Sequence, residues 1–239
     1  MTRYILVHGA GHGGWCWDKV AARLRQAGHD VLTPDLPGRA GTAAELGAAT
    51  MDSYVAALVT LLDAQDGPSV LLGHSMGGLS VTGAAEARPD KVAALVYLTA
   101  YAAIDGDSVG SILEGDPDSQ VPAATELVAD GLAVQIAEAR VIPIFYNDLP
   151  ADEAGAAQAQ LVPEPAIALG GAVRVTPEGA GRVAKFYLGC LRDQCIDIAF
   201  QRQLAARSGS HWAGEIDAGH SAFLSQPDAV VRHLLSLTA

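Results

Sequence analysis

The stretch GHSMGG at residues 73–78 constrains the fold of this chain more than any other segment. The apolar run SVLLG leads into it, and a helical pattern begins directly after it. A sharp strand-to-helix turn leaves room only for small side chains two residues either side of its tip, and Gly73 and Gly77 supply them around Ser75. With 26 glycines in the chain, the pattern alone is a weak signal, so its strand and helix context carries the argument. The segment predicts a nucleophile elbow with Ser75 exposed over the edge of a sheet.

A serine hydroxyl is a weak nucleophile at neutral pH, so this turn predicts a histidine base elsewhere in the chain. Of seven histidines, His211 and His220 lie well beyond the serine and outside helical patterns. His220 is preferred because it follows the expected strand 211–216, whereas His211 opens that strand at the opposite edge. A lone loop histidine is more often a hydrogen-bonded surface residue, and only its order after Ser75 favours the catalytic interpretation.

A carboxylate that orients the base is expected between the serine and the histidine. Asp193 is the first carboxylate after the expected strand 183–189, which places it at the same sheet edge as the other two groups. Asp197 falls in the next expected helix and Asp217 lies only three residues from His220, so they rank second and third. The competing interpretation of an aspartate after a strand is a helix cap.

The start of the chain supplies a further part of the site. The expected strand 4–9 runs into the glycine-rich segment HGAGHGGWCW at 8–17, whose backbone amides can turn toward a bound oxygen. We expect the amides of Ala10 and Met76 to form an oxyanion hole, which stabilises negative charge on a substrate during acyl transfer. The alternative is that the glycines only form a tight loop.

These segments, together with DLPG at 35–38, the aspartate of LRDQCI and the histidine of DAGHSAFL, resemble one branch of the α/β-hydrolase superfamily in order and spacing. That branch holds plant methylesterases, plant hydroxynitrile lyases and bacterial esterases of the pyrethroid-hydrolase type. The resemblance covers most of the chain and is thin between 104 and 180. It implies that Ser75, Asp193 and His220 form a catalytic triad.

The same resemblance separates hydrolysis from cyanide release. The lyases of this branch carry a threonine after the first histidine of the oxyanion loop and a lysine after the catalytic histidine. This chain has Gly9 and Ser221 there, so no cation is present to receive cyanide. A serine in place of an aspartate nucleophile also argues against a dehalogenase or an epoxide hydrolase.

The pattern along the chain predicts an α/β-hydrolase fold with a mostly parallel sheet of about six strands and helices on both faces. Strands are expected at about 3–8, 30–34, 69–73, 92–98, 183–189 and 211–216, and helices near 15–27, 51–65, 76–88, 197–207 and 227–237. Residues 104–180, the cap segment, break this alternation, with amphipathic stretches near 121–140 and 151–161. We expect a catalytic core of residues 1–103 and 181–239 with the cap segment inserted over the elbow.

Composition sets limits on compartment and cofactors. A chain of 239 residues that is 50% hydrophobic can bury one full core. It shows no apolar run long enough to cross a bilayer and no signal peptide before the first strand, which predicts a cytoplasmic protein. Three scattered cysteines suit reduced thiols. No nucleotide-binding motif is present, and the histidines at 8, 12 and 74 have no carboxylate cluster beside them, so neither cofactor nor metal is expected.

Net charge is concentrated in the cap segment. Residues 105–180 hold 13 acidic and two basic residues, a balance of −11, against −1 for the rest of the chain. Nucleic acid and anionic membranes would be repelled. The acidic residues either keep an alanine-rich insertion soluble or, as our hypothesis, favour neutral over anionic esters.

The sequence therefore predicts a serine esterase that acts on a neutral, hydrophobic small-molecule ester, including a methyl ester, through an acyl-enzyme. A thioesterase, lactonase or amidase on the same triad is an alternative, as are a hydroxynitrile lyase and a ligand receptor without turnover. The sequence does not indicate an oligomeric state. Substrate-binding side chains are expected at His12, Trp15, Phe145, Tyr146 and Leu149, with Ile144 beside them. Core packing of the cap is the competing interpretation for Phe145 and Tyr146.

Overall fold

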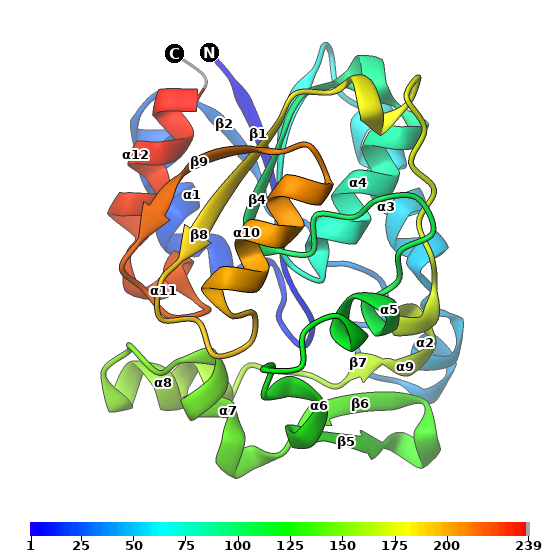
Figure 1. The fold of residues 1–239 in the computed structure, drawn as a ribbon, viewed down its shortest axis with the longest axis vertical. Helices are drawn as coiled ribbons and strands as arrows, with labels where there is room; N and C mark the ends of the chain where they lie inside the picture. The colour runs from blue at the N-terminus through cyan, green and yellow to red at the C-terminus, as the bar shows by residue number, and fades with distance from the viewer. Residues whose placement is uncertain (238–239) are drawn as a thin grey trace.

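The computed structural model describes residues 1–237, and its centre is a sheet of six parallel strands (Figure 1). In spatial order the strands are β2 (Asp30–Leu32), β1 (Arg3–Val7), β3 (Ser69–Ser75), β4 (Val92–Ala100), β8 (Lys185–Cys190) and β9 (His211–Ile216). All neighbouring pairs are parallel. This confirms the predicted sheet, and each strand lies within about two residues of its expected position.

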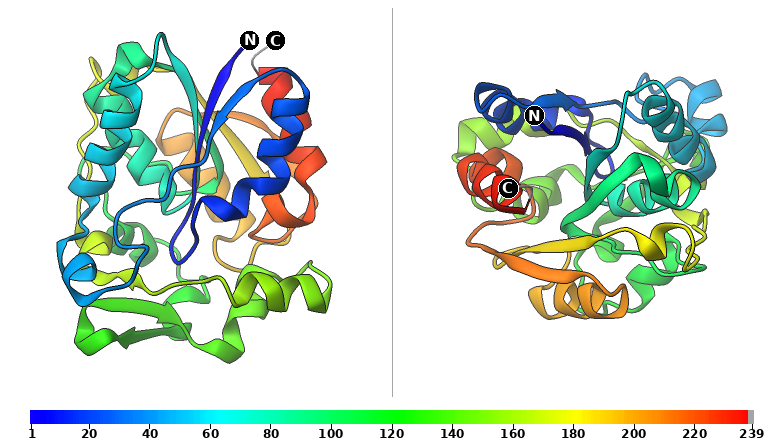
Figure 2. Two further views of the ribbon diagram at one scale, coloured as in Figure 1. Left: turned by 180° about the vertical axis from the view of Figure 1, so that it is seen from behind. Right: turned by 90° about the horizontal axis from the view of Figure 1, so that it is seen from above.

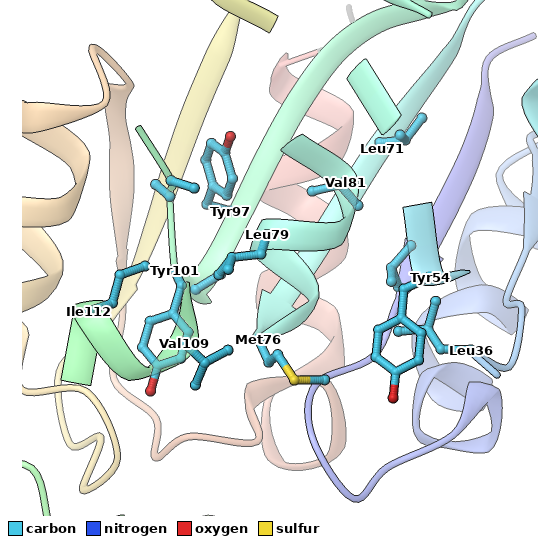
Figure 3. Close-up of a cluster of buried hydrophobic side chains, with 14 of the residues drawn as sticks. Leu36, Tyr54, Leu71, Met76, Leu79, Val81, Tyr97, Tyr101, Val109 and Ile112 are labelled. Atoms are coloured by element: carbon cyan, nitrogen blue, oxygen red, sulfur yellow. The ribbon is translucent and has the colours of Figure 1, made fainter. Parts of the chain in front are cut away.

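Helices cover both faces of this sheet, because successive strand side chains enter two separate apolar cores. In β1, Tyr4 and Leu6 pack in one core while Ile5 and Val7 pack in the other. The first core is covered by α1 (Asp18–Gln26), α11 (Ala222–Ser225) and α12 (Pro227–Leu237), and the second by α3 (Met51–Asp63), α4 (Gly77–Ala87) and α10 (Ile198–Arg207). Figure 3 shows part of the second core, where Met76 ends the β3–α4 turn.

Local sequence explains where several of these helices begin. Thr50 and Ser53 form a reciprocal capping box at the start of α3. Asp197 accepts a hydrogen bond from the amide of Ala199 and caps α10. Asp197 thus acts as a helix cap, the role that the sequence offered as the competing interpretation of such an aspartate.

The remaining elements connect the sheet or build the cap segment. Outside the cap segment lie α2 (Ala43–Ala48) and the short 3₁₀ helices η1 (Gly14–Trp17), η2 (Pro89–Lys91) and η4 (Ala180–Arg182), the last of which starts at the segment boundary. The cap segment holds α5 (Val109–Glu114), α6 (Val121–Ala124), β5 (Thr125–Val128), η3 (Ala129–Gly131), β6 (Ala133–Ile136), α7 (Glu138–Phe145), α8 (Ala151–Gln158), β7 (Glu164–Pro165) and α9 (Ala166–Gly170). Strands β5, β6 and β7 form a second, antiparallel sheet.

The cap segment as far as α9 lies beyond the carboxyl ends of the parallel strands, at the end of the molecule opposite the two termini, and its last residues run back past the end of α4 to η4 (Figures 1 and 2). The amphipathic stretch at 121–140 forms mainly the β5–β6 hairpin, and the stretch at 151–161 contains α8. This small sheet was not predicted, because its short strands lack a clear alternation of apolar and polar residues. Ser75, which ends β3, therefore faces the cap segment side of the sheet.

Two global properties follow from the described residues. Within 1–237 no helix combines the length and apolar character needed to cross a bilayer. Cys16, Cys190 and Cys195 are buried free thiols, as the cysteine pattern predicted.

Candidate active site

Ser75 sits at the tip of the strand-to-helix turn in a backbone conformation that side chains rarely adopt. Its φ is 52°, in the left-handed region. A Cβ added at Gly77 would lie 2.5 Å from the carbonyl oxygen of His8, and one added at Gly73 would lie 2.7 Å from that of Gly77. The glycines thus permit a turn that no larger residue could make, and the turn presents Ser75 to the cavity described below.

The glycine-rich loop after β1 approaches this serine closely. A Cβ at Gly9 would lie 2.8 Å from the Cβ of Ser75 and 2.9 Å from Nδ1 of His74. Ala10 follows on the same loop, and Ala10 and Met76 line one cavity together with Ser75. The two residues expected to supply oxyanion donors therefore flank the expected nucleophile.

Asp193 and His220 form a buried hydrogen-bonded pair. Asp193 lies in the loop after β8 and His220 in the loop after β9, and Nδ1 of His220 is 2.8 Å from Oδ2 of Asp193. Their side chains are 0% and 1% exposed, so water screens the interaction little. The other candidates lie elsewhere: Asp217 is exposed in an ion pair with Arg192, and His211 opens β9 at the opposite edge.

Three further donors hold the Asp193 carboxylate. Oδ1 accepts the amides of Cys195 at 2.6 Å and Ile196 at 3.1 Å, and Oδ2 accepts the hydroxyl of Thr99. Thr99 has a φ of 38°, which is unusual for a β-branched residue. In this conformation the hydroxyl of Thr99, near the end of β4, bonds to the carboxylate, and this contact helps to fix the orientation of Asp193.

His74 joins the elbow to the loop at residues 217–221 that carries His220, called the base loop below. Its Nε2–H donates to the carbonyl of His220 at 3.0 Å, and the two imidazole rings are 4.4 Å apart between centroids. On the other side of the base, the Phe145 ring stacks on His220 at 5.6 Å. Asp148 accepts the amide of Gly219 at 2.8 Å, so the cap segment also holds the base loop.

Three buried histidines around the elbow are neutral structural groups. Burial lowers the pKa of His8 to about 3 and that of His12 to about 4, and it lowers the pKa of His74 well below its ordinary value. Each donates one ring N–H to a backbone carbonyl. The second ring nitrogen of His8 accepts the amide of Leu36 and that of His12 accepts the Tyr146 hydroxyl.

One cluster of metal-ligand residue types occurs among residues 1–237, formed by Asp193, Cys195 and His220. Burial raises the pKa of the Cys195 thiol well above its ordinary value, so a thiolate ligand is disfavoured there. The Asp193 oxygens are already occupied by His220 and by hydroxyl and amide donors. The hydrogen bonds around Asp193 are therefore those of an oriented acid–base pair.

A cavity of about 890 Å³ opens beside Ser75 between the core and the cap segment. The core contributes Ala10, Gly11, Ser75 and Met76 to its wall. Most of the remaining wall is apolar and includes Tyr101, Val109, Leu113, Val121, Val134, Ile136, Val141, Phe145, Leu161, Val162 and Leu169. A site of this kind takes a large, mainly hydrophobic ligand.

Of the five residues expected to bind substrate, one lines this cavity and the other four do not. Phe145 lines the wall. His12 and Tyr146 are buried and bonded to each other at 2.9 Å, Trp15 stacks on His12, and Leu149 packs against the apolar core. A direct role in substrate binding stays a prediction for all five.

Sequence reasoning missed Thr99, Asp148 and the linking role of His74. A usable signal existed for Thr99, because it is a hydroxyl residue directly after the buried run 92–98, the position from which the other site residues were found. Asp148 carries no such signal, since it is one of many acidic residues in the cap segment.

We expect Thr99→Val to lower kcat/KM about tenfold, because a hydrogen bond to a charged group contributes about 1.5–3 kcal/mol. Thr99→Ser keeps the hydroxyl and should stay within about twofold of wild type. Hydrolysis rates of a p-nitrophenyl ester measure both, with thermal unfolding recorded in parallel. If Thr99→Val loses stability but no activity, Thr99 has no part in orienting the acid.

Acid should destabilise the fold through the buried histidines. His8 and His12 have lowered pKa values when folded, so between pH 6.5 and about 4 the unfolded chain binds protons that the folded chain excludes. Their stabilising contribution is therefore full above pH 6.5 and is lost as pH falls. In urea unfolding, the free energy of unfolding should fall by about 1.4 kcal/mol per pH unit for each such histidine. His12→Gln removes one of these histidines, so this variant should lose about 1.4 kcal/mol per pH unit from that slope. A free energy of unfolding that is constant from pH 7 to 5 would contradict this.

Comparison with known proteins agrees with this geometry. A model described as the alpha/beta hydrolase family matches residues 4–233. The pyrethroid hydrolase of Sphingobium wenxiniae is 32% identical, over 95% of this chain and 84% of that protein, and methylesterase 9 of Arabidopsis thaliana is 28% identical, over 99% and 98%. The crystal structure of a pyrethroid hydrolase from Sphingobium faniae is similar with a TM-score of 0.88 and 28% identity, covering 99% of this chain and 96% of that one. These similarities confirm the branch that the motifs resembled: the chain belongs to the alpha/beta hydrolase family.

Proposed function

We propose that this chain hydrolyses large, neutral, hydrophobic carboxylic esters through an acyl-enzyme formed on Ser75. The chain is a carboxylic ester hydrolase by its family and its named relatives. The observation that supports the mechanism is the strained turn that presents Ser75 at the wall of a large apolar cavity. The bonded His220–Asp193 pair adds to it, since His74, the residue before Ser75, is hydrogen-bonded to the carbonyl of His220.

The proposed reaction has two halves. His220, oriented by Asp193, removes the proton of the Ser75 hydroxyl as its oxygen attacks the ester carbonyl carbon. The amides of Ala10 and Met76 stabilise the oxyanion, which collapses as the C–O bond breaks and His220 protonates the leaving alcohol. Water then attacks the acyl-enzyme with His220 as base, and the acid product and free Ser75 are released.

The cavity supports a bulky substrate. At about 890 Å³ it lies near the upper end of ligand sites, well beyond the needs of a short-chain methyl ester. A methyl ester of a large acid also fits this volume. The named relatives act on pyrethroids or are methylesterases, and both classes are compatible with a large hydrophobic substrate.

The competing functions have less support in this chain. Gly9 leaves no room for the threonine of the lyases, and position 221 carries a buried serine where they carry a lysine. The relatives reported above are named as ester hydrolases, which does not favour a thioesterase, lactonase or amidase. A receptor without turnover would not need an oriented acid–base pair.

In the proposed function, the cap segment selects the substrate and the core performs the chemistry. The cap segment supplies most of the cavity wall and contacts both the oxyanion loop and the base loop. The three buried free thiols agree with a cytoplasmic setting, which we propose as the compartment.

Substitution of the nucleophile and acid tests the mechanism. Ser75→Ala should lower kcat by up to about 10⁶-fold, and Asp193→Asn by about 10⁴-fold, because the base loses its orientation. Asp217→Asn is the matched control and should retain activity, since Asp217 is exposed and paired with Arg192. Labelling of Ser75 by a fluorophosphonate, read by mass spectrometry, confirms the nucleophile. Substantial activity in Asp193→Asn would show that another carboxylate is the acid.

An ester panel tests the substrate class. Across neutral p-nitrophenyl esters, kcat/KM should rise about three- to fourfold per added methylene until the cavity is filled, since a buried CH₂ contributes about 0.8 kcal/mol. An anionic ester of equal size should react more slowly, and the gap should narrow as salt screens the acidic cap segment. A preference for acetyl over longer esters would contradict the bulky-substrate proposal, and a neutral-to-anionic ratio independent of salt would contradict the charge effect.

A further inference from the structure

A buried ion pair joins the cap segment to the core beside the oxyanion loop. Glu164, in β7, accepts a hydrogen bond from Nη2 of Arg39 at 2.8 Å. The two side chains are only 2% and 10% exposed. Burying two charges is costly unless their remaining groups are satisfied. For Glu164 the hydroxyl of Tyr54 donates to the other carboxylate oxygen at 2.6 Å, whereas Nε of Arg39 is buried without a partner.

This ion pair holds the backbone of the oxyanion loop from two sides. The amide of Gly11 donates to Oε2 of Glu164 at 2.8 Å, and Nη1 of Arg39 donates to the carbonyl of His12 at 3.0 Å. The carbonyl of Gly11 accepts the amide of Val162 at 2.9 Å. Both polar groups of Gly11, a residue with a φ of +72°, are therefore bonded to the cap segment.

We infer that Glu164 and Arg39 are positioning residues that fix the Ala10 amide for oxyanion binding. The inference rests on the proposed function, in which that amide is one of two oxyanion donors. Ala10 immediately precedes Gly11, so holding the Gly11 peptide limits rotation of the loop beside Ser75. Preorganised donors stabilise a developing charge because they need not reorient during the reaction.

The pairing of Glu164 with Arg39 has an electrostatic reason. Glu164 also lines the cavity, where an unpaired negative charge would oppose the oxyanion. Arg39 offsets this charge, and the contacts with Gly11, Arg39 and Tyr54 occupy both carboxylate oxygens. Glu164 thus acts on the loop rather than on the substrate.

The test is Glu164→Gln, which keeps the shape and one acceptor but removes the charge that holds Arg39. We expect kcat to fall about 10- to 100-fold with KM within about twofold, less than the loss for deleting an oxyanion donor. A trifluoromethyl ketone, which forms a charged tetrahedral adduct on Ser75, should bind more weakly by the same factor. The corresponding methyl ketone, which forms no such adduct to a comparable extent, should bind as it does to wild type.

Glu215→Gln is the matched control, because Glu215 in β9 also accepts a hydrogen bond from an arginine, Nη2 of Arg202 at 2.6 Å, but does not line the cavity. It should leave kcat and the binding of both ketones within about twofold. Tyr54→Phe removes one donor to Glu164 without touching the loop and should give a smaller loss of the same kind. If Glu164→Gln fails to fold, Tyr54→Phe tests the positioning role in its place.

Distinct results separate the two proposals. Wild type whose Ser75 is not labelled by a fluorophosphonate would reject the proposed function itself. Normal labelling with unchanged kcat and trifluoromethyl ketone affinity in Glu164→Gln would overturn the positioning role alone. A rise in KM and in the methyl ketone dissociation constant, with kcat unchanged, would also overturn it, by showing direct substrate contact.

Discussion

The left-handed backbone at Ser75 is the constraint on which the rest of the site depends. A non-glycine residue in this region costs about 1–3 kcal/mol and persists only where the surroundings enforce it. Here β3 and α4 enforce it, and the close approach of the oxyanion loop is possible because Gly9, Gly73 and Gly77 carry no side chain. The strained residue is Ser75, the nucleophile that we propose, so one turn links the fold to the proposed chemistry.

Around this turn, hydrogen bonds hold groups from distant parts of the chain in place. Thr99 and two backbone amides fix the acid, His74 ties the elbow to the base loop, and Asp148 reaches the base loop from the cap segment. The cap segment thus contacts the catalytic loops as well as enclosing the cavity. A change in the cap segment can therefore affect turnover as well as substrate size.

Much of this arrangement could be predicted from the sequence because it follows local rules. Apolar runs fixed the six strands, and the order of polar residues after them selected Ser75, Asp193 and His220, of which the last two form the bonded pair. The secondary structure of the cap segment could not be predicted, because its strands are short and its helices are irregular. The hydrogen bond between His12 and Tyr146 could not be predicted either, although a polar group in an apolar interior is stable only with a partner, because it joins two residues that are distant in the sequence.

What the sequence alone determined is the parallel sheet and the residues at its carboxyl edge, because periodicity and glycine spacing act over a few residues. What only the tertiary structure decided is which groups hold the site in place, the shape of the cavity, and the Glu164–Arg39 contact with the oxyanion loop. The Glu164 contacts join residues more than 100 positions apart, and their geometry depends on how the cap segment packs on the core, which no local pattern encodes.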